Sequence, residues 1–151
     1  MMKKTIAFFL IPLLFAACIR VDQAPDTSDS DEKPADGVFL HVSKGSDDTH
    51  AVEMALMLAD KFSTSNDVLL FFDQKGIEMV VKGAPNLEMD PFDGSDEVFD
   101  RLLDHDVEIL ACPACLQAAG YTEDDLRRGV KIAEKEHFFD FTEGRILTLD
   151  Y

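Results

Sequence analysis

Two cysteines separated by two residues, Cys112 and Cys115, carry the clearest chemical signal in the sequence. They follow the apolar stretch 107–111, which predicts a buried strand, and Pro113 suits the first position of a helix. Ligands bind at the carboxyl edge of open parallel sheets, and the dipole and unpaired N–H groups of a helix start favour a thiolate. We therefore expect Cys112 to act as a nucleophile and Cys115 as a resolving or modulating thiol.

Two other interpretations of this pair stay open at the level of sequence. The first is a structural disulfide, or two buried thiols, in an oxidising compartment. The second is half of a zinc site, which would need two further ligands. The histidines that could supply them do not form a second close pair: His41, His50, His105 and His137. With a disulfide, the protein would be a non-catalytic binding or assembly module.

A thioredoxin-like enzyme is disfavoured by the order of the motifs. The thioredoxin cysteines follow an early strand and face a proline from later in the chain. Here the pair follows the third predicted strand, no proline occurs after Pro113, and the chain contains no tryptophan.

The elements that must position the cysteines alternate between strand and helix. Apolar runs predict strands at 38–42, 68–72, 107–111, 130–133 and 145–149. Helical spacing, caps and stop signals predict helices at 51–62, 77–81, 95–103, after Cys112, at 122–128 and at 134–141, with Ser95 as a cap. This order implies an α/β fold with three layers and a mostly parallel five-stranded sheet.

Polar residues follow the first two predicted strands and should lie at the same edge as Cys112. They are Ser43, Lys44 and Asp47 after the first strand, and Asp73, Gln74 and Lys75 after the second. Together they could line a pocket for a small anion or thiol, although ordinary polar loops would look the same.

Charge and length limit the classes of function. The 14 Lys and Arg residues against 30 Asp and Glu residues give a net charge of −16 over 151 residues. Such a surface argues against nucleic-acid binding and against adhesion of the folded surface to an anionic membrane. The length suits one domain. No motif in the sequence predicts a bound cofactor or metal.

The N-terminus carries an export signal. Lys3 and Lys4 precede an apolar run and the small pair before Cys18, a pattern typical of a secretory signal peptide, although an uncleaved N-terminal helix remains an alternative. The stretch resembles a bacterial lipobox, with Phe15 where leucine is usual. That resemblance implies lipidation of Cys18, attachment to the membrane through lipid alone, and a place on the periplasmic side of the envelope, with the outer membrane favoured. The predicted parts are a signal peptide at 1–17, an acidic tether at 18–37 and a domain at 38–151.

The domain resembles the DsrE/DsrF-like sulfur-relay family. The resemblance is carried by the cysteine after the third strand, the small-residue helix 113–119, Gly120, the later pair Gly129-Val130, and the run 38–72. It implies a Rossmann-like fold, a homotrimer or homohexamer, and a persulfide carried on Cys112, with Cys115 matching a second cysteine found in some relatives. It also implies a sulfur donor and acceptor of unidentified chemistry. The characterised relay members are cytosolic, whereas this chain resembles an exported lipoprotein.

Overall fold

The computed structural model describes residues 34–151 of the chain. The predicted signal peptide, the predicted lipidation site Cys18 and residues 19–33 of the predicted tether lie outside the described residues. The last tether residues join the fold: Gly37 opens the first strand, and the Asp36 carboxylate pairs with the guanidinium of Arg145.

The described elements alternate as the sequence predicts, with short 3₁₀ helices between some of them. In chain order they are β1 (Gly37–Val42), η1 (Ser46–Asp48), α1 (Thr49–Ser63), β2 (Asp67–Phe72), η2 (Gln74–Met79), α2 (Ser95–Asp104), β3 (Glu108–Ala111), α3 (Pro113–Ala118), η3 (Glu123–Asp125), β4 (Val130–Ile132), α4 (His137–Asp140) and β5 (Ile146–Asp150). Among these helices, none is both long and apolar enough to cross a bilayer.

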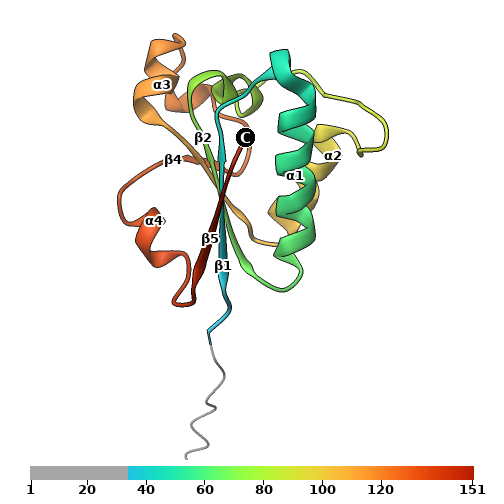
Figure 1. Cartoon of the computed structure of the whole chain (residues 1–151). Helices are drawn as coiled ribbons and strands as arrows, with labels where there is room; N and C mark the ends of the chain where they lie inside the picture. Colours follow the sequence, from blue (N-terminus) through green and yellow to red (C-terminus); the bar gives the residue numbers. More distant parts are fainter. Residues whose placement is uncertain (1–33) are drawn as a thin grey trace, which may run out of the picture. The chain divides into compact units, whose positions relative to one another are not determined.

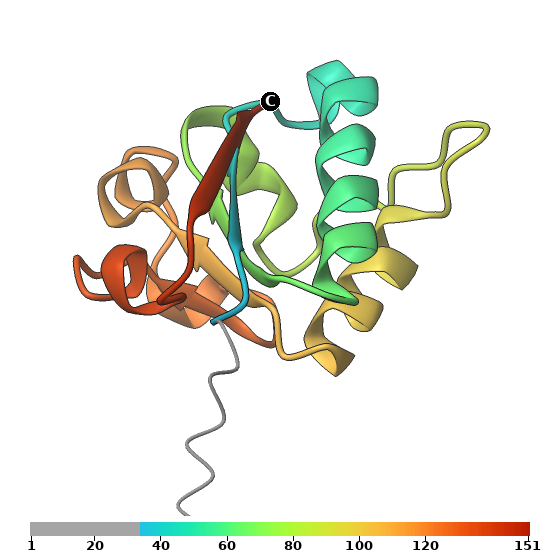
Figure 2. The ribbon, with the colours of Figure 1, turned by 60° about the horizontal axis from the view of Figure 1, so that its bottom comes forward.

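The five strands form one sheet in the order β4-β3-β2-β1-β5, and every neighbouring pair is parallel. Helices α1 and α2 cover one face of the sheet, and α3 and α4 lie on the other (Figure 1), an arrangement that the rotated view repeats (Figure 2). The predicted three-layer α/β fold with a parallel five-stranded sheet is therefore confirmed.

The main core lies between the sheet and the helices α1 and α2. Alternate strand residues point to this side, including Leu40, Leu70 and Ile109, and they pack against Val52 and Leu56 of α1. Helix α1 starts where the Asp48 side chain accepts the N–H of Ala51 at 3.2 Å, which satisfies one of the free donors of the first turn. Burial of these apolar side chains fixes the strands in register.

The opposite face of the sheet holds a smaller aromatic cluster. The rings of Phe39 and Phe71 stack at a centroid distance of 6.4 Å, and Phe138 of α4 meets both edge-on. The three phenylalanines near α4 therefore have different surroundings. Phe138 belongs to this cluster, Phe139 is 72% exposed, and the ring of Phe141 lies against Gly37.

Several short helices differ from their predicted extent. Only η3 forms within the predicted helix 122–128. The backbone of Leu126 is extended there, and this residue forms an antiparallel bridge with Val81. The N–H of Arg127 then bonds to the carbonyl of Val80 at 3.0 Å, so pairing with a distant segment replaces the helical bonds. The predicted helix 134–141 is reduced to α4, and the predicted helix 77–81 is the 3₁₀ helix η2, which begins three residues earlier.

The prediction that Ser95 caps the helix after the acidic loop was wrong. Gly94 occupies the cap position, and the hydroxyl of Ser95 is buried, where it accepts the N–H of Leu87 at 2.8 Å. The N–H of Asp96 in the first turn, which has no carbonyl partner within the helix, instead donates to the Asn86 side chain at 2.9 Å. The cap therefore comes from a loop residue outside the helix.

Candidate functional site

The carboxyl ends of β1, β2 and β3 meet at one edge of the sheet. The register pairs Val42 with Phe72 and Phe72 with Ala111. The residues that directly follow the three strands therefore lie beside one another. Main-chain bonds extend the pairing by one step: Asp73 N–H donates to Val42 O at 3.2 Å, and Cys112 N–H donates to Phe72 O at 2.9 Å. Cys112 is thus fixed at the edge where ligands bind in parallel sheets.

The cysteine pair sits at the start of α3, as predicted. Cys112 is the N-cap residue, Pro113 occupies the first turn, and the Sγ of Cys112 accepts the N–H of Cys115 at 3.5 Å. Both side chains are partly exposed, and both are free thiols in the structure. A main-chain N–H aimed at Sγ stabilises negative charge on that sulfur.

A strained residue, Gln74, approaches the second thiol. Its φ of +43° lies in the left-handed region, which is costly for a residue with a side chain. In this conformation the N–H of Gln74 hydrogen-bonds to the Cys115 sulfur, which by itself lowers the pKa of Cys115. Burial, the neighbouring Cys112 and the carboxylate of Asp73 together outweigh this bond, so the pKa of Cys115 is raised.

The loops after β1 and β2 pack too closely for larger residues. A Cβ on Gly76 would lie 2.2 Å from the carbonyl oxygen of Val42, and a Cβ on Gly45 would lie 2.6 Å from the carbonyl oxygen of Lys75. The same loops are joined by the ion pair between Lys75 Nζ and Asp47 Oδ2 at 2.5 Å, which lowers the pKa of Asp47 and raises that of Lys75. This close approach holds Gln74 against Cys115.

The predicted edge residues are therefore only partly assembled around the thiols. Gln74 hydrogen-bonds to Cys115 through its N–H and the charge of Asp73 acts on that thiol, whereas the ammonium of Lys75 pairs with Asp47. The hydroxyl of Ser43 donates to the carbonyl of Tyr151 at 3.0 Å and so secures the C-terminal strand.

His41 is a functional candidate that the sequence analysis considered only as a zinc ligand. Its Nε2 lies 2.9 Å from Asp73 Oδ1, and its Nδ1 lies 2.9 Å from Asp150 Oδ1. The ring stacks beside Phe71 at a centroid distance of 5.8 Å. Partial burial lowers the pKa of His41, but the two carboxylates outweigh it and raise the pKa above its usual 6.5.

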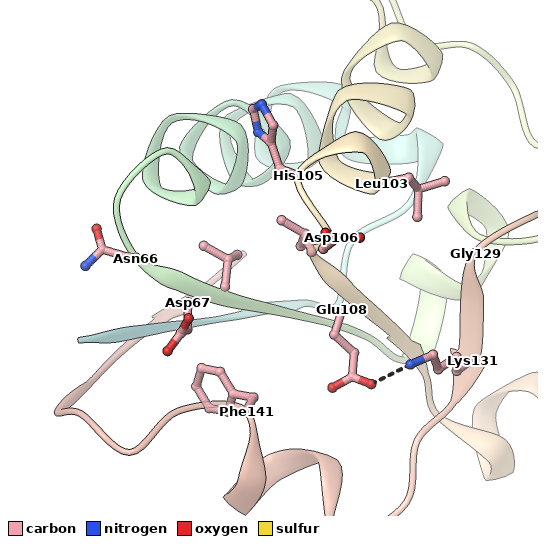
Figure 3. Close-up of a pocket in the computed structure, with 11 residues that line it drawn as sticks. Asn66, Asp67, Leu103, His105, Asp106, Glu108, Gly129, Lys131 and Phe141 are labelled. Atoms are coloured by element: carbon pink, nitrogen blue, oxygen red, sulfur yellow. Dashed lines mark hydrogen bonds and ion pairs between the residues drawn. The ribbon is translucent and has the colours of Figure 1, made fainter. Parts of the chain in front are cut away.

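A polar pocket of about 500 Å³ lies at the opposite, amino edge of the sheet. Figure 3 shows the acids Asp67, Asp106 and Glu108 around it, with Glu108 bonded to Lys131 at 3.0 Å. Because the thiols lie at the carboxyl edge, this pocket is separate from the cysteine chemistry.

A buried acid, Glu53, lies under the loop that precedes α2. Glu53 on α1 is 1% exposed, and neither of its carboxyl oxygens has a hydrogen-bond partner among the described residues. It lines a cavity of about 70 Å³ together with Phe92, Asp93 and Arg101. Burial, and secondarily the charge of Asp93, raises the pKa of Glu53 to about 7.

Within residues 34–151, no three His, Cys, Asp or Glu side chains are arranged to hold a metal ion. His105 lines the amino-edge pocket, and His137 lies 3.8 Å from Glu108 near the same edge. His50 packs against Phe92. These three histidines therefore make their contacts elsewhere in the fold and are not gathered around the cysteine pair.

Comparison with known proteins agrees with this architecture. The model of the DsrE/DsrF-like family matches residues 36–144. The crystal structure of the YchN protein from E. coli aligns with a TM-score of 0.51 at 16% identity, covering 76% of this chain and 98% of that one. A protein of unknown function from Methanobacterium thermoautotrophicum, MTH1491, aligns with a TM-score of 0.52 at 14% identity, covering 76% and 99%. Comparison with curated proteins gave no match.

Proposed function

Because the chain belongs to the DsrE/DsrF-like family, we propose that it is a sulfur carrier that holds a persulfide on Cys112 and uses Cys115 as the resolving thiol. The observation that carries this proposal is the hydrogen bond from the Cys115 N–H to the Cys112 Sγ at the helix start. That bond directs a main-chain N–H at the Cys112 sulfur, whereas the surroundings of Cys115 raise the pKa of the second thiol.

The loading step involves no net oxidation. The Cys112 thiolate attacks the outer sulfur of a donor persulfide, the S–S bond of the donor breaks, and the donor leaves as a thiolate. The sulfane sulfur is then bound to Cys112. A thiolate of an acceptor can attack that terminal sulfur and take it, which returns Cys112 as a thiolate.

The resolving step releases the sulfur when no acceptor is present. The Cys115 thiolate attacks the Sγ of Cys112, the bond to the terminal sulfur breaks, and hydrosulfide leaves. The two cysteine sulfurs are oxidised to a disulfide, and the sulfane sulfur is reduced to sulfide. A dithiol reductant must then restore the pair.

The N-terminal sequence supports a proposal for the location of this chemistry. We propose an exported lipoprotein, acylated on Cys18 and held on the periplasmic side of the envelope, with the outer membrane favoured. The proposal rests on the basic start, the apolar run and the small residues before Cys18.

We further propose that the protein forms a homotrimer or homohexamer. Apolar side chains remain uncovered on β5 and α4: Ile146 is 51% exposed, Leu147 is 50% exposed and Phe139 is 72% exposed. Contact between subunits would bury such residues, and β5 is an edge strand of the sheet.

The test is the intact mass of the reduced protein after incubation with a sulfane-sulfur donor. The wild-type chain should gain one sulfur atom, and Cys112→Ser should abolish the gain. With Cys115→Ser the adduct should persist longer, because the thiol that expels the sulfur is absent. A wild-type chain that accepts no sulfur would contradict the proposal and favour a binding module.

A further inference from the structure

We propose that residues 88–93, which we call the lid, form a pH-sensitive cover over Glu53. The lid stays closed while the Glu53 carboxyl is protonated and lifts when that carboxyl ionises. This inference goes beyond the sulfur-carrier function, because the cavity of Glu53 is lined by α1, α2 and the lid, whereas the cysteines lie at the start of α3 on the other face of the sheet.

Glu53 is a carboxyl without a partner in a small cavity. Its side chain is 1% exposed, and neither of its oxygens has a hydrogen-bond partner among the described residues. The cavity that it lines, of about 70 Å³, is walled on its apolar side by Phe92 and Val98. With no donor and no cation against its oxygens, an ionised carboxylate is much more costly there than the neutral acid.

The other charged groups around the cavity add to this preference. They are Asp60 on α1, Asp93 in the lid and Arg101 on α2. The guanidinium of Arg101 lies 3.0 Å from Asp60, 2.9 Å from Asp93 and 2.9 Å from Glu97. Three carboxylates therefore already share the one cation that lines the cavity, and a charge on Glu53 would repel Asp93 without compensation.

The lid is joined to a firm base. Leu87 is buried and exchanges two hydrogen bonds with Ser95: its N–H donates to the Ser95 hydroxyl at 2.8 Å, and its carbonyl accepts the Ser95 N–H at 2.9 Å. The segment that follows this base projects beside α1 and α2 in both views (Figures 1 and 2). The lid can therefore lift from its base while α2 stays in place.

Two side chains hold the lid down over Glu53. The ring of Phe92 lies against His50 of α1 at a centroid distance of 5.8 Å, and Asp93 pairs with Arg101. The side chains of this ion pair are 63% and 32% exposed, so the pair contributes little to closure. Closure therefore depends on apolar contact above a neutral carboxyl.

The sign of the pH dependence follows from the two states. In the closed state burial raises the pKa of Glu53 to about 7, whereas in the open state the carboxyl meets water and regains its ordinary 4.5. Because the open state loses its proton first, a rise in pH favours it over the range between these values. From pH 6 to pH 8 the open population should increase about tenfold.

The experiment places one thiol in the cavity and measures how often it is reached. Val98 lines the cavity and is 2% exposed, and Val98→Cys replaces it with another small apolar side chain. The full chain also carries Cys18→Ser, Cys112→Ser and Cys115→Ser, which remove the 3 natural cysteines and make the test independent of sulfur chemistry. The alkylation rate by iodoacetamide is measured at pH 6 and pH 8.

The same chain with Glu53→Gln is the reference. Both chains share the titration of the introduced thiol and of His50, so the ratio of their rates isolates the ionisation of Glu53. We expect this ratio, Glu53 chain over Glu53→Gln chain, to rise about tenfold from pH 6 to pH 8. Glu97→Gln removes a carboxylate from the same guanidinium and should leave that rise unchanged.

A second buried thiol separates lid opening from unfolding of the whole domain. Val52→Cys lies on α1 with 0% exposure inside the main core, where only global unfolding exposes it. It should be alkylated more slowly than the thiol of Val98→Cys. A rate ratio that stays constant between pH 6 and pH 8, or equal rates for the two buried thiols, would overturn the inference.

Discussion

The main-chain N–H of Cys115 points at the Sγ of Cys112 across 3.5 Å, while the sulfur of Cys115 accepts the main-chain N–H of Gln74. Cys115 therefore donates its backbone N–H to the first sulfur and holds its own sulfur in an environment that opposes charge. This asymmetry is the physical basis for assigning different roles to two thiols only three positions apart in the chain.

The buried acid Glu53 should make the protein less stable as pH rises. Its folded pKa of about 7 lies above the ordinary 4.5, so the unfolded chain loses its proton first and stability falls between those two values. Glu53→Gln, which is always neutral, should raise the free energy of unfolding at pH 8 by up to about 3 kcal/mol and change it little at pH 4. Urea unfolding at both pH values measures this.

The control for that variant is Glu97→Gln, which removes an exposed carboxylate that pairs with Arg101 at 2.9 Å. An exposed pair contributes less than about 1 kcal/mol, so this variant should show no comparable gain. A Glu53→Gln protein that is no more stable than wild type at pH 8 would mean that this carboxyl finds a partner in solution.

The close approach at Gly76 should be sensitive to a single added methyl group. Gly76→Ala puts a Cβ 2.2 Å from the carbonyl oxygen of Val42, so the loop carrying Gln74 must move. We expect a loss of about 1–3 kcal/mol in the free energy of unfolding. A Cβ on Gly120 would have no neighbour within 4 Å. Gly120→Ala should therefore lower the free energy of unfolding by only about 1 kcal/mol, the cost of placing alanine at a φ of +85°. Equal losses would contradict the steric account.

The lipidation of Cys18 can be tested in cells. The basic, apolar and small-residue pattern before Cys18 predicts that labelled fatty acid enters the wild-type protein. A Cys18→Ser chain should carry no label. Equal labelling of both chains, or of neither, would exclude the lipobox interpretation.

Self-association should strengthen as salt rises. The chain carries a net charge of −16, so subunits repel each other at low ionic strength, and salt screens that repulsion. Light scattering of residues 34–151 should show a trimer or hexamer that gains population from low to molar salt. A monomer at every salt concentration would rule out the proposed assembly.

The main strands and the position of Cys112 were predictable because they depend on local patterns. A continuous apolar run such as 68–72 is what a parallel strand covered on both faces requires, and the structure has β2 there. Pro113 after Cys112 likewise marks a helix start by local chemistry alone.

The features that the sequence did not reveal depend on distant partners. Leu126 leaves the helix because it bridges Val81, and a helix pattern cannot show such pairing. His41 bonds to Asp150, which lies 109 positions away in the chain, so no local motif marks this ion pair. The one available signal was strand parity: a histidine within an apolar strand needs a polar partner at the sheet edge.

The measurement that tests the central claim most directly is tandem mass spectrometry of the peptide that contains both cysteines, after loading with a sulfane-sulfur donor. In the Cys115→Ser chain we predict one added sulfur, located on Cys112, and in the Cys112→Ser chain we predict none on Cys115. Sulfur found equally on either remaining cysteine, or on neither, would contradict the assignment of Cys112 as the sulfur carrier.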